Sequence, residues 1–336
     1  MEHPHIIIES NIPFSRGLFD DVARVSYLSP AEITPEAMAN ADALITRTRT
    51  RCNEALLSGS KCKIIASATI GLDHVDTEWC RNAGIEVRNA PGCNAPAVAQ
   101  YVLASIIQAH GTNLSGLTLG IIGVGHVGSI VQRWAAGLGM NVLACDPPRA
   151  LAEGSEGFCS MDRIAREADV ITVHTPYTKR SPFATHHLLN AEFFNSLQRK
   201  PMVINSARGP IADTAALKAA IHTGRVSQVV IDCWEGEPDI DLQLLQQAFI
   251  ATPHIAGYSR EGKIRATAMA VEAVAKALQL PKPHMSVPIP GQAPERVTAE
   301  AVLKSYNPLT DTRMLRSNPG DFEKLRNTYN LRAEVH

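Results

Sequence analysis

The run Leu119–Gly128, LGIIGVGHVG, constrains the fold of this chain more than any other segment. It has the pattern of an apolar strand that ends in Gly-x-Gly-x-x-Gly and passes directly into a helix. In such a turn the first glycine permits the sharp bend, the second lets the backbone approach a pyrophosphate, and the third lets helix and strand pack closely. The N–H groups at the helix N-terminus attract phosphates. The run therefore predicts a dinucleotide-binding βαβ unit whose cofactor-binding residues are Gly123, Gly125, His126, Val127 and Gly128.

A second apolar segment, MNVLACD, ends at Asp146, roughly 20 residues after the glycine run. A carboxylate at this distance is expected to hydrogen-bond the 2′-hydroxyl of the cofactor ribose and to repel a 2′-phosphate. Asp146 therefore predicts NAD as the cofactor rather than NADP. The alternative is a glycine-rich turn in a βαβ unit that binds no dinucleotide.

Composition excludes several classes of function. The 336 residues exceed the length at which single cores split, so two domains are expected. A formal net charge of −1 offers no attraction to nucleic acid or to an anionic membrane. We see neither a secretory signal nor an apolar run of the ~18 residues that a membrane span needs. Seven cysteines without a CxxC pair favour a reduced, cytoplasmic protein with no disulfide framework and no metal site.

Hydrophobic patterning predicts an α/β chain throughout. In the first ~90 residues, buried strands are expected at 5–9, 43–46 and 63–67, with an amphipathic helix over 12–25. Asn94 is expected to cap a helix that runs to about residue 111. Further apolar strands at 169–174, 201–207, 228–234 and 249–255 alternate with helical stretches such as 213–224. Continuous apolar strands between helices indicate a parallel sheet that is covered on both faces.

The last part of the chain is less regular. A long helix is predicted from Ser259 to about residue 280, and prolines then interrupt regular structure over 281–294. The polar tail that follows has one weak helical pattern, at 322–329. It is interpreted as a small appendage for oligomerisation or, equally, as a partly mobile tail.

Ligands of open parallel sheets bind at the carboxyl ends of the strands, and three polar side chains there are candidates for chemistry. Arg208 can grip a carboxylate bidentately, His254 can exchange a proton with a hydroxyl near neutral pH, and Glu237 can orient the imidazole. Each also has a purely structural alternative: a salt bridge, a structural histidine and a turn cap. Together they suit the oxidation of a 2-hydroxy acid, with the hydride passing to a nicotinamide cofactor.

With these motifs in place, residues 5–280 resemble the D-isomer-specific 2-hydroxyacid dehydrogenase family. The resemblance rests on the glycine run, on NSARGPIAD around Arg208, on DCWEGEP with Glu237, and on TPHIAGYS with His254. It implies that Arg208, Glu237 and His254 are the catalytic residues and that His254 is the acid/base.

The resemblance also implies two doubly wound parallel-sheet domains. A flavodoxin-like substrate domain is expected over 1–93 and 255–281, a Rossmann NAD-binding domain over 94–254, and a short C-terminal appendage over 282–336. This appendage is expected to be shorter than the family's dimerisation domain, so a homodimer is expected to form through another surface.

Within the family, ESNIPF, GLDHVD, NAPGCNA, CDPPRA and PHIAGYSREGK resemble the members that oxidise 4-phospho-D-erythronate to 3-hydroxy-2-oxo-4-phosphobutanoate with NAD, in pyridoxal 5′-phosphate (vitamin B6) biosynthesis. The implied contacts with this small phosphorylated substrate include Thr48, Thr69 and Tyr258. Those implied for the cofactor are Asp146, Thr175, Ala207, Asp232 and Gly257.

The loop RTRTR is the candidate phosphate site, because a doubly charged phosphate needs cations and Arg47, Arg49 and Arg51 lie within it. If the loop is extended, all three arginines lie on one side and Thr48 on the other, and the alternative is a solvated loop surface. The turn 68–71, with Gly71, can offer backbone N–H groups to the substrate carboxylate. Competing functions are another D-2-hydroxyacid dehydrogenase, acting on 3-phosphoglycerate or an unphosphorylated acid, and an NAD(H)-sensing binding module of the same fold.

Overall fold

The computed structural model describes residues 3–336, which form two compact units. The first unit comprises the chain up to Asn94 together with Arg260–Gly291. The second comprises Ala95–Ser259 together with Gln292–His336. This division differs from the predicted one in two places after residue 254. Residues 255–259 belong to the second unit and not to the first, and residues 282–336 form no separate appendage, because those up to 291 belong to the first unit and those from 292 pack on the second.

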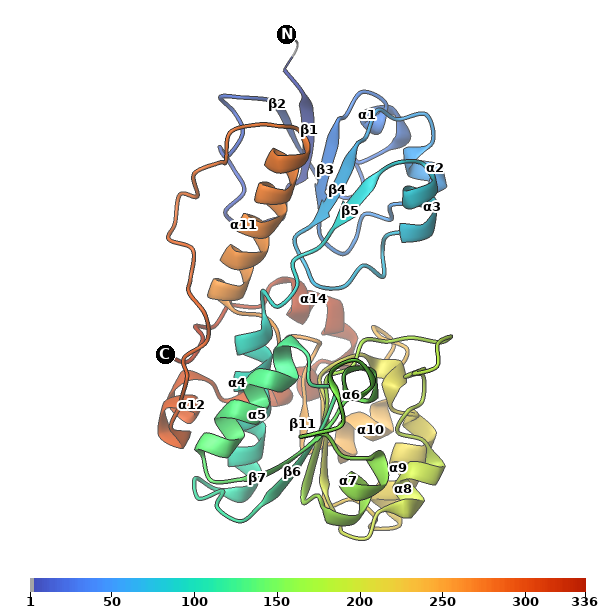
Figure 1. Ribbon diagram of the computed structural model, residues 1–336, viewed down its shortest axis with the longest axis vertical. Coiled ribbons are helices and arrows are strands. Elements are labelled where there is room, and N and C mark those ends of the chain that lie inside the picture. Colours follow the sequence, from blue (N-terminus) through green and yellow to red (C-terminus); the bar gives the residue numbers. More distant parts are fainter. Residues whose placement is uncertain (1–2) are drawn as a thin grey trace. The chain divides into compact units, whose positions relative to one another are not determined.

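The first unit is built on a five-stranded parallel sheet with the order β2-β1-β3-β4-β5 (Figure 1). This is the flavodoxin-like order, and it changes direction between β1 and β3. The strands are β1 (His5–Glu9), β2 (Arg24–Leu28), β3 (Ala43–Thr46), β4 (Ile64–Ser67) and β5 (Glu86–Arg88).

Both faces of this sheet are covered because apolar side chains point alternately to its two sides. Ile6 and Ile8 lie in one core with α11 (Arg260–Ala277), whereas Ile7 lies in the other core with Met38. The second face is covered by α1 (Pro35–Met38), α2 (Glu54–Leu57) and α3 (Thr77–Asn82). The predicted long helix after Ser259 is confirmed as α11.

The predicted helix over residues 12–25 is wrong. Residues 11–23 form successive turns, and β2 begins at Arg24. Phe14 takes a positive φ of 61°, and the Ser15 hydroxyl donates to the Ile12 carbonyl oxygen at 2.8 Å. A left-handed residue and a side chain that bonds to the backbone both compete with helix formation, which a hydrophobic pattern does not register.

The second unit contains a six-stranded parallel sheet with the order β11-β10-β9-β8-β6-β7. The direction of strand order changes between β6 and β8, where a Rossmann sheet binds its ligand. All six strands were predicted. They are β6 (Thr118–Ile122), β7 (Asn141–Cys145), β8 (Val170–Val173), β9 (Met202–Asn205), β10 (Gln228–Ile231) and β11 (Ile250–Ala251).

Helices cover this sheet on both faces too. One face packs against α4 (Ala95–His110) and α5 (His126–Gly137), both of which were predicted. Asn94 does not cap α4 as expected, because its Oδ1 atom has no hydrogen-bond partner among residues 3–336. The remaining helices are α6 (Pro147–Glu153), α7 (Met161–Glu167), α8 (Ala191–Ser196), the 3-10 turn η1 (Gly209–Ile211), α9 (Thr214–His222) and α10 (Leu242–Gln247).

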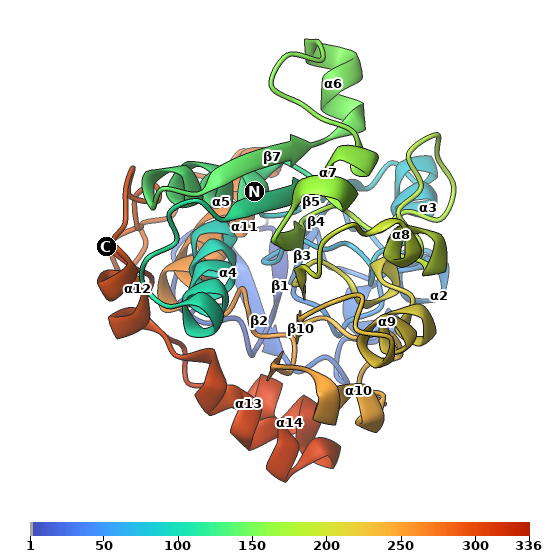
Figure 2. The same ribbon diagram turned by 90° about the horizontal axis from the view of Figure 1, so that it is seen from below.

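The C-terminal segment is an integral part of the second unit (Figure 2). Its α13 packs along the edge strand β11, where the Thr312 hydroxyl accepts the Ala251 N–H at 3.1 Å, and Leu315 and Phe322 join the core. The weak helical pattern near residue 322 is confirmed as a helix. The segment comprises α12 (Ala299–Ser305), α13 (Pro308–Ser317), the 3-10 turn η2 (Pro319–Asp321) and α14 (Phe322–Asn327).

Candidate active site

The glycine run forms the turn between β6 and α5, and each glycine is needed for a different reason. Gly123 has a φ of 89°, and a Cβ there would lie 2.8 Å from the His174 carbonyl carbon. A Cβ on Gly128 would lie 2.1 Å from the Gly123 oxygen. Gly125 is exposed, and a Cβ there would meet no heavy atom within 4 Å. The space above Gly125 and the exposed N-terminus of α5, where His126 and Val127 lie, suit a pyrophosphate.

Asp146 is held beside this turn. Its Oδ2 atom accepts the Val124 N–H at 2.8 Å, and its Oδ1 atom accepts the Arg149 N–H at 3.1 Å as the N-cap of α6. The Arg149 guanidinium forms an ion pair with Glu153 at 2.7 Å and donates to the Val124 carbonyl oxygen at 2.6 Å. The fixed carboxylate keeps lone pairs with which it can accept ribose hydroxyls.

Two buried hydroxyls lie at the ends of neighbouring strands and lack partners. Thr175 Oγ1 follows β8 and Ser206 Oγ follows β9, and neither has a hydrogen bond within the part of the chain that the structure describes. Buried polar atoms are normally paired, so these two suit a bound polar group. Thr175 was predicted as a cofactor residue, whereas Ser206, which also follows an apolar strand, was assigned no role. The carbonyl oxygen of Ala207 already accepts a hydrogen bond, from Arg208 Nη1 at 2.8 Å. The turn, Asp146 and these hydroxyls together fit a dinucleotide.

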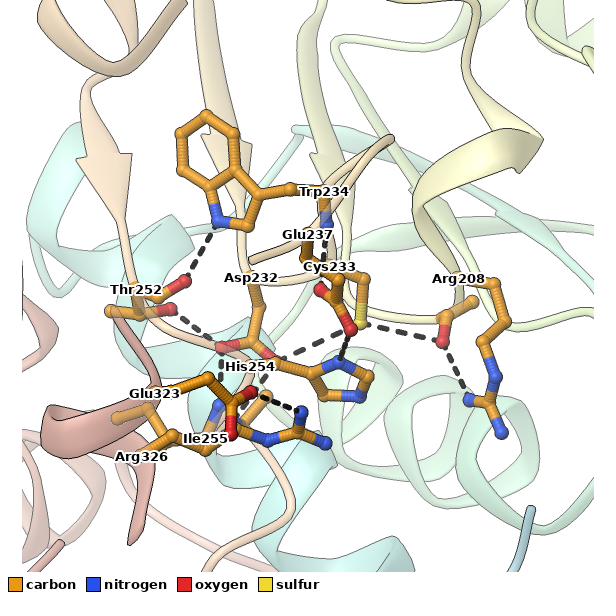
Figure 3. A network of polar contacts seen from close by, with 12 residues as sticks. Arg208, Asp232, Cys233, Trp234, Glu237, Thr252, His254, Ile255, Glu323 and Arg326 are labelled. Carbon is orange, nitrogen blue, oxygen red and sulfur yellow. Dashed lines mark hydrogen bonds and ion pairs between the residues drawn. The ribbon is translucent and has the colours of Figure 1, made fainter. Parts of the chain in front are cut away.

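The structure brings two of the three predicted catalytic side chains into direct contact (Figure 3). His254 Nδ1 lies 2.6 Å from Glu237 Oε1, while Glu237 Oε2 accepts the Trp234 N–H at 3.2 Å. Burial acts to raise the pKa of Glu237, but its hydrogen bond to His254 and the charge of His254 outweigh burial, so the pKa lies below its ordinary value. The ionised carboxylate therefore accepts the Nδ1 proton, which leaves Nε2 as the nitrogen for proton exchange.

The backbone around His254 is locked by Asp232, the residue after β10. The His254 N–H donates to the Asp232 carbonyl oxygen at 2.9 Å, and the residue has a φ of 55°, in the left-handed region. The Asp232 carboxylate accepts the Thr252 hydroxyl at 2.7 Å and the N–H groups of Ile255 and Ala256 at 2.8 and 3.0 Å. Burial raises the pKa of Asp232 above its ordinary value, although the charge of His254 and these hydrogen bonds act to lower it. Asp232, predicted as a cofactor residue, thus also fixes the loop that carries His254.

Arg208 projects from the loop after β9. Its carbonyl oxygen accepts from Asn205 Nδ2 at 3.0 Å. A Cβ on the next residue, Gly209, would lie 2.0 Å from the Trp234 carbonyl oxygen. This close approach joins the loops that bear Arg208 and Glu237. Figure 3 shows the guanidinium and the His254 ring on the same side of the strand ends.

The C-terminal segment adds an arginine that sequence reasoning missed. Arg326 lies on α14, and its Nη1 is 3.5 Å from Glu323 Oε1 (Figure 3). Burial acts to lower the pKa of Arg326, but Tyr258 and Glu237 raise it. The weak helical pattern around residue 326 gave no sign of this proximity to Glu237, because the two residues come from distant parts of the chain.

In the first unit, the candidate phosphate loop is tied down by Glu9, the last residue of β1. Its fully buried carboxylate accepts, through Oε2, the Thr46 hydroxyl at 2.6 Å, the Arg47 N–H at 2.8 Å and the Thr50 hydroxyl at 3.0 Å. The chain bends at residues 48–50, so the extended form that would place the three arginines on one side is not found. Thr48 and Arg49 are exposed. Glu9 was missed, although a carboxylate directly after an apolar strand was a signal.

The turn 68–71 is also fixed. The Thr69 hydroxyl donates to the Gly71 oxygen at 3.1 Å and lies 2.9 Å from the Ser67 hydroxyl, while Asn89 Nδ2 donates to the Ile70 oxygen at 2.7 Å. The predicted substrate residues Thr69 and Gly71 thus lie in the first unit, as do Arg47, Thr48 and Arg49, whereas Tyr258 and Gly257 lie in the second.

The described residues offer neither a metal centre nor a membrane-spanning helix. Among residues 3–336, no three His, Cys, Asp or Glu side chains are arranged to hold a metal ion. Over the same residues, none of the helices combines the length and apolar character needed to span a membrane.

The fold and the site define a nicotinamide-dependent 2-hydroxyacid dehydrogenase, and comparisons with known proteins agree. Residues 95–256 match the model of the D-isomer specific 2-hydroxyacid dehydrogenase NAD binding domain. D-lactate dehydrogenase from Aquifex aeolicus, solved with NAD and lactic acid, aligns with a TM-score of 0.68 at 27% identity, over 82% of this chain and 95% of that one.

Curated relatives make the assignment more specific. Erythronate-4-phosphate dehydrogenase of Bacteroides thetaiotaomicron is 46% identical over 98% of this chain and 97% of its own length. The protein of that name from Porphyromonas gingivalis is 42% identical over 96% of this chain and 92% of its own. The chain therefore belongs to the D-isomer-specific 2-hydroxyacid dehydrogenase family, in the group of the erythronate-4-phosphate dehydrogenases. It is an NAD-dependent enzyme. Since 97% of the Bacteroides protein is matched, the expected shortening of the C-terminal segment is not seen against that relative.

Proposed function

We propose that the enzyme oxidises 4-phospho-D-erythronate to 3-hydroxy-2-oxo-4-phosphobutanoate, with reduction of NAD, in pyridoxal 5′-phosphate biosynthesis. The substrate assignment is supported by the name shared by the Bacteroides and Porphyromonas relatives, which are 46% and 42% identical over nearly the whole chain. The chemistry is carried by one observation, the 2.6 Å contact between His254 Nδ1 and Glu237 Oε1. Homodimer formation and a cytoplasmic location remain part of this proposal.

In the proposed mechanism His254 takes the proton from the C2 hydroxyl of the substrate through Nε2. Glu237 holds the opposite nitrogen and stabilises the imidazolium that forms. Arg208 grips the substrate carboxylate and polarises the developing carbonyl group. NAD, when bound, accepts the hydride that leaves C2, so the alcohol becomes a ketone and the proton stays on His254.

The proposed cofactor contacts all lie in the second unit. The glycine turn and the N-terminus of α5 would hold the pyrophosphate, and Asp146 the adenosine ribose. Thr175, Ala207, Asp232 and Gly257 lie at the ends of the neighbouring strands and would line the rest of the cofactor.

We propose that the 4-phosphate is bound by the loop that Glu9 ties down. Thr48 and Arg49 are exposed on this loop and Arg47 is half-buried. The loop therefore carries a hydroxyl group and guanidinium groups, which suit the binding of a phosphate. Backbone N–H groups of the turn 68–71, with the Thr69 hydroxyl, would contact the carboxylate end of the substrate, and Tyr258 would also contact the substrate.

The test is NADH formation with 4-phosphoerythronate, 3-phosphoglycerate and erythronate, and NADH consumption with the matching 2-oxo acids. We expect clear preference for the 4-phosphorylated pair. Better turnover of 3-phosphoglycerate or erythronate would keep the mechanism and overturn the substrate. Binding of NADH without turnover in either direction would instead favour an NAD(H)-sensing role.

Two variants test the residue roles. His254→Ala should lower kcat about 10²–10⁴-fold, the usual contribution of a general acid/base. Arg208→Lys should also be strongly impaired, because a point charge cannot replace a planar fork. Activity of His254→Ala within a few-fold of the parent enzyme would assign the proton transfer to another group.

A further inference from the structure

The loop after His254, residues 255–258, is held from one side by a carboxylate. The N–H groups of Ile255 and Ala256 donate to the two oxygens of Asp232 at 2.8 and 3.0 Å. In the trans peptide group that joins Ile255 and Ala256, the Ile255 carbonyl oxygen therefore points away from Asp232, into the interior of the second unit, where both residues are buried. Buried carbonyl groups need donors, and the sheet does not supply them here.

The Tyr258 N–H supplies one donor, to the Ile255 carbonyl oxygen at 2.8 Å, and the other donors come from one side chain far along the chain. Arg332 Nη1 donates to the carbonyl oxygens of Ile255 at 3.0 Å and Tyr258 at 3.1 Å, and Nη2 donates to that of Ala256. The remaining N–H groups reach α4, at the Ala97 carbonyl oxygen (3.1 Å) and Gln100 Oε1 (3.2 Å). The planar fork of arginine can serve carbonyl groups in several directions at once, which no other side chain can do.

The guanidinium is buried and tightly enclosed. Arg332 is only 9% exposed, and its guanidinium carbon lies 4.1 Å from the centroid of the Tyr306 ring. Beside it, the Ser259 hydroxyl donates to Glu334 at 2.7 Å, and Ser259 pairs with Arg332 through a backbone bridge. The cation has no direct carboxylate partner within hydrogen-bond distance among residues 3–336. Its charge instead acts on carbonyl groups of the loop, among them that of the Ile255–Ala256 peptide group, whose N–H donates to Asp232.

We propose that Arg332 is a positioning residue of the active site, which clamps the loop that follows His254 and carries Gly257 and Tyr258. The inference rests on the proposed function for the roles of these three residues. Asp232 and Arg332 hold the two ends of the Ile255–Ala256 peptide group, and Arg332 also holds the carbonyl groups of Ala256 and Tyr258. The loop therefore keeps this conformation only while both residues are present. The C-terminal segment is then part of the catalytic apparatus.

A second arginine of the same segment provides a matched control. Arg316, on α13, donates to the carbonyl oxygens of Leu245 at 3.2 Å and of Ala248, at the end of α10. It therefore docks the C-terminal segment by the same chemistry but does not touch residues 254–258. If Arg332 only docked the C-terminal segment, Arg316→Met and Arg332→Met would have the same effects on hydrogen exchange at residues 254–259 and on kcat.

The experiment compares Arg332→Met, Arg332→Lys and Arg316→Met by thermal unfolding, NADH titration, steady-state kinetics and hydrogen exchange of the peptide that covers residues 254–259. For Arg332→Met we expect faster exchange in this peptide, weaker NADH binding, and a kcat lowered about 10–100-fold, as for a group displaced by about 1 Å. Arg332→Lys, which should fold because it keeps the charge, should show the same changes to a smaller degree. Arg316→Met should lower the melting temperature but leave exchange at 254–259 and kcat within about threefold.

Several outcomes would overturn the proposal. They are unchanged exchange and kcat in Arg332→Lys, or equal effects of Arg332→Met and Arg316→Met on this peptide. If Arg332→Met does not fold, Arg332→Lys decides alone. If the parent enzyme turns over none of the substrates tested, the proposed function fails, but exchange at 254–259 and NADH affinity still test the clamp.

Discussion

Glu237 Oε1 lies 2.6 Å from Nδ1 of His254, although 17 residues separate the two in the chain. The carboxylate comes from the loop after β10 and the imidazole from the loop after β11, so the parallel pairing of these strands sets their separation. The contact defines which imidazole nitrogen can exchange a proton, so a neutral side chain at position 237 tests whether the charge of the carboxylate contributes.

Glu237→Gln should lower kcat for oxidation about 10–100-fold, because the imidazolium that forms loses its charged partner. Glu237→Asp keeps the charge but shortens the side chain, so it separates the charge of the carboxylate from its reach to Nδ1. Steady-state kinetics of both variants check this. A kcat of Glu237→Gln within a few-fold of the parent enzyme would mean that Glu237 orients the ring without acting through its charge.

Asp146→Ala should reduce the preference for NAD over NADP, measured as a ratio of kcat/KM, by about tenfold or more, because a charged hydrogen bond to the ribose and the repulsion of a 2′-phosphate are both lost. Asp146→Asn keeps an acceptor for the Arg149 N–H and so separates charge from helix capping. Asp162→Ala, an exposed carboxylate in the first turn of α7, is the control. An unchanged ratio in both Asp146 variants would remove this residue from the ribose.

Alanine at the second glycine of the turn should affect cofactor binding, whereas alanine at the third should affect stability. In Gly128→Ala the new Cβ meets the Gly123 oxygen at 2.1 Å, so we expect a loss of about 1–3 kcal/mol of stability without cofactor. In Gly125→Ala no heavy atom lies within 4 Å, so the melting temperature of the cofactor-free protein should not change, while NADH affinity falls at least tenfold. Thermal unfolding and NADH titration distinguish the two. Normal NADH affinity in Gly125→Ala would place the pyrophosphate elsewhere.

Glu9→Ala should raise the KM for the phosphorylated substrate about tenfold or more while leaving the NADH dissociation constant unchanged, because the three donors of the 46–50 segment lose their shared acceptor. Each unpaired buried donor costs about 1–3 kcal/mol, so stability should also fall. Glu86→Ala removes an exposed carboxylate from β5 of the same sheet and is the control. An equal loss of NADH affinity and substrate affinity would argue against a local effect on the loop.

Most of the strands and the long helices could be predicted from the sequence because each has an apolar pattern that does not depend on distant contacts. The two edge strands of the first unit, β2 and β5, were missed because neither contains a fully buried residue and so neither has a continuous apolar pattern. The glycine turn was equally predictable, since its geometry follows from residues next to one another. The segment 12–25 was mistaken for a helix because its apolar spacing suits one, whereas Phe14 in the left-handed region and the turn at Ser15 depend on local backbone geometry.

The site was only partly predictable. Arg208, Glu237 and His254 were named as chemical candidates, but spacing alone could not establish that two of them touch. Glu9 and Arg332 were missed because their importance comes from burial: one carboxylate serves three donors of a loop some 40 residues away, and one guanidinium serves carbonyl groups more than 70 residues earlier. Such long-range hydrogen bonds have no counterpart in local pattern.

The distance in sequence between the loop and its arginine also bears on how the enzyme is made. Arg332 follows Tyr258 by 74 residues. At about 5–20 residues per second, a ribosome needs roughly 4–15 s to synthesise that stretch. During this time His254 and Glu237 have already been synthesised, but the carbonyl groups of Ile255, Ala256 and Tyr258 still lack the donors of Arg332. A nascent chain can therefore complete both sheets before it has a finished catalytic centre, and activity should appear later in synthesis than the fold.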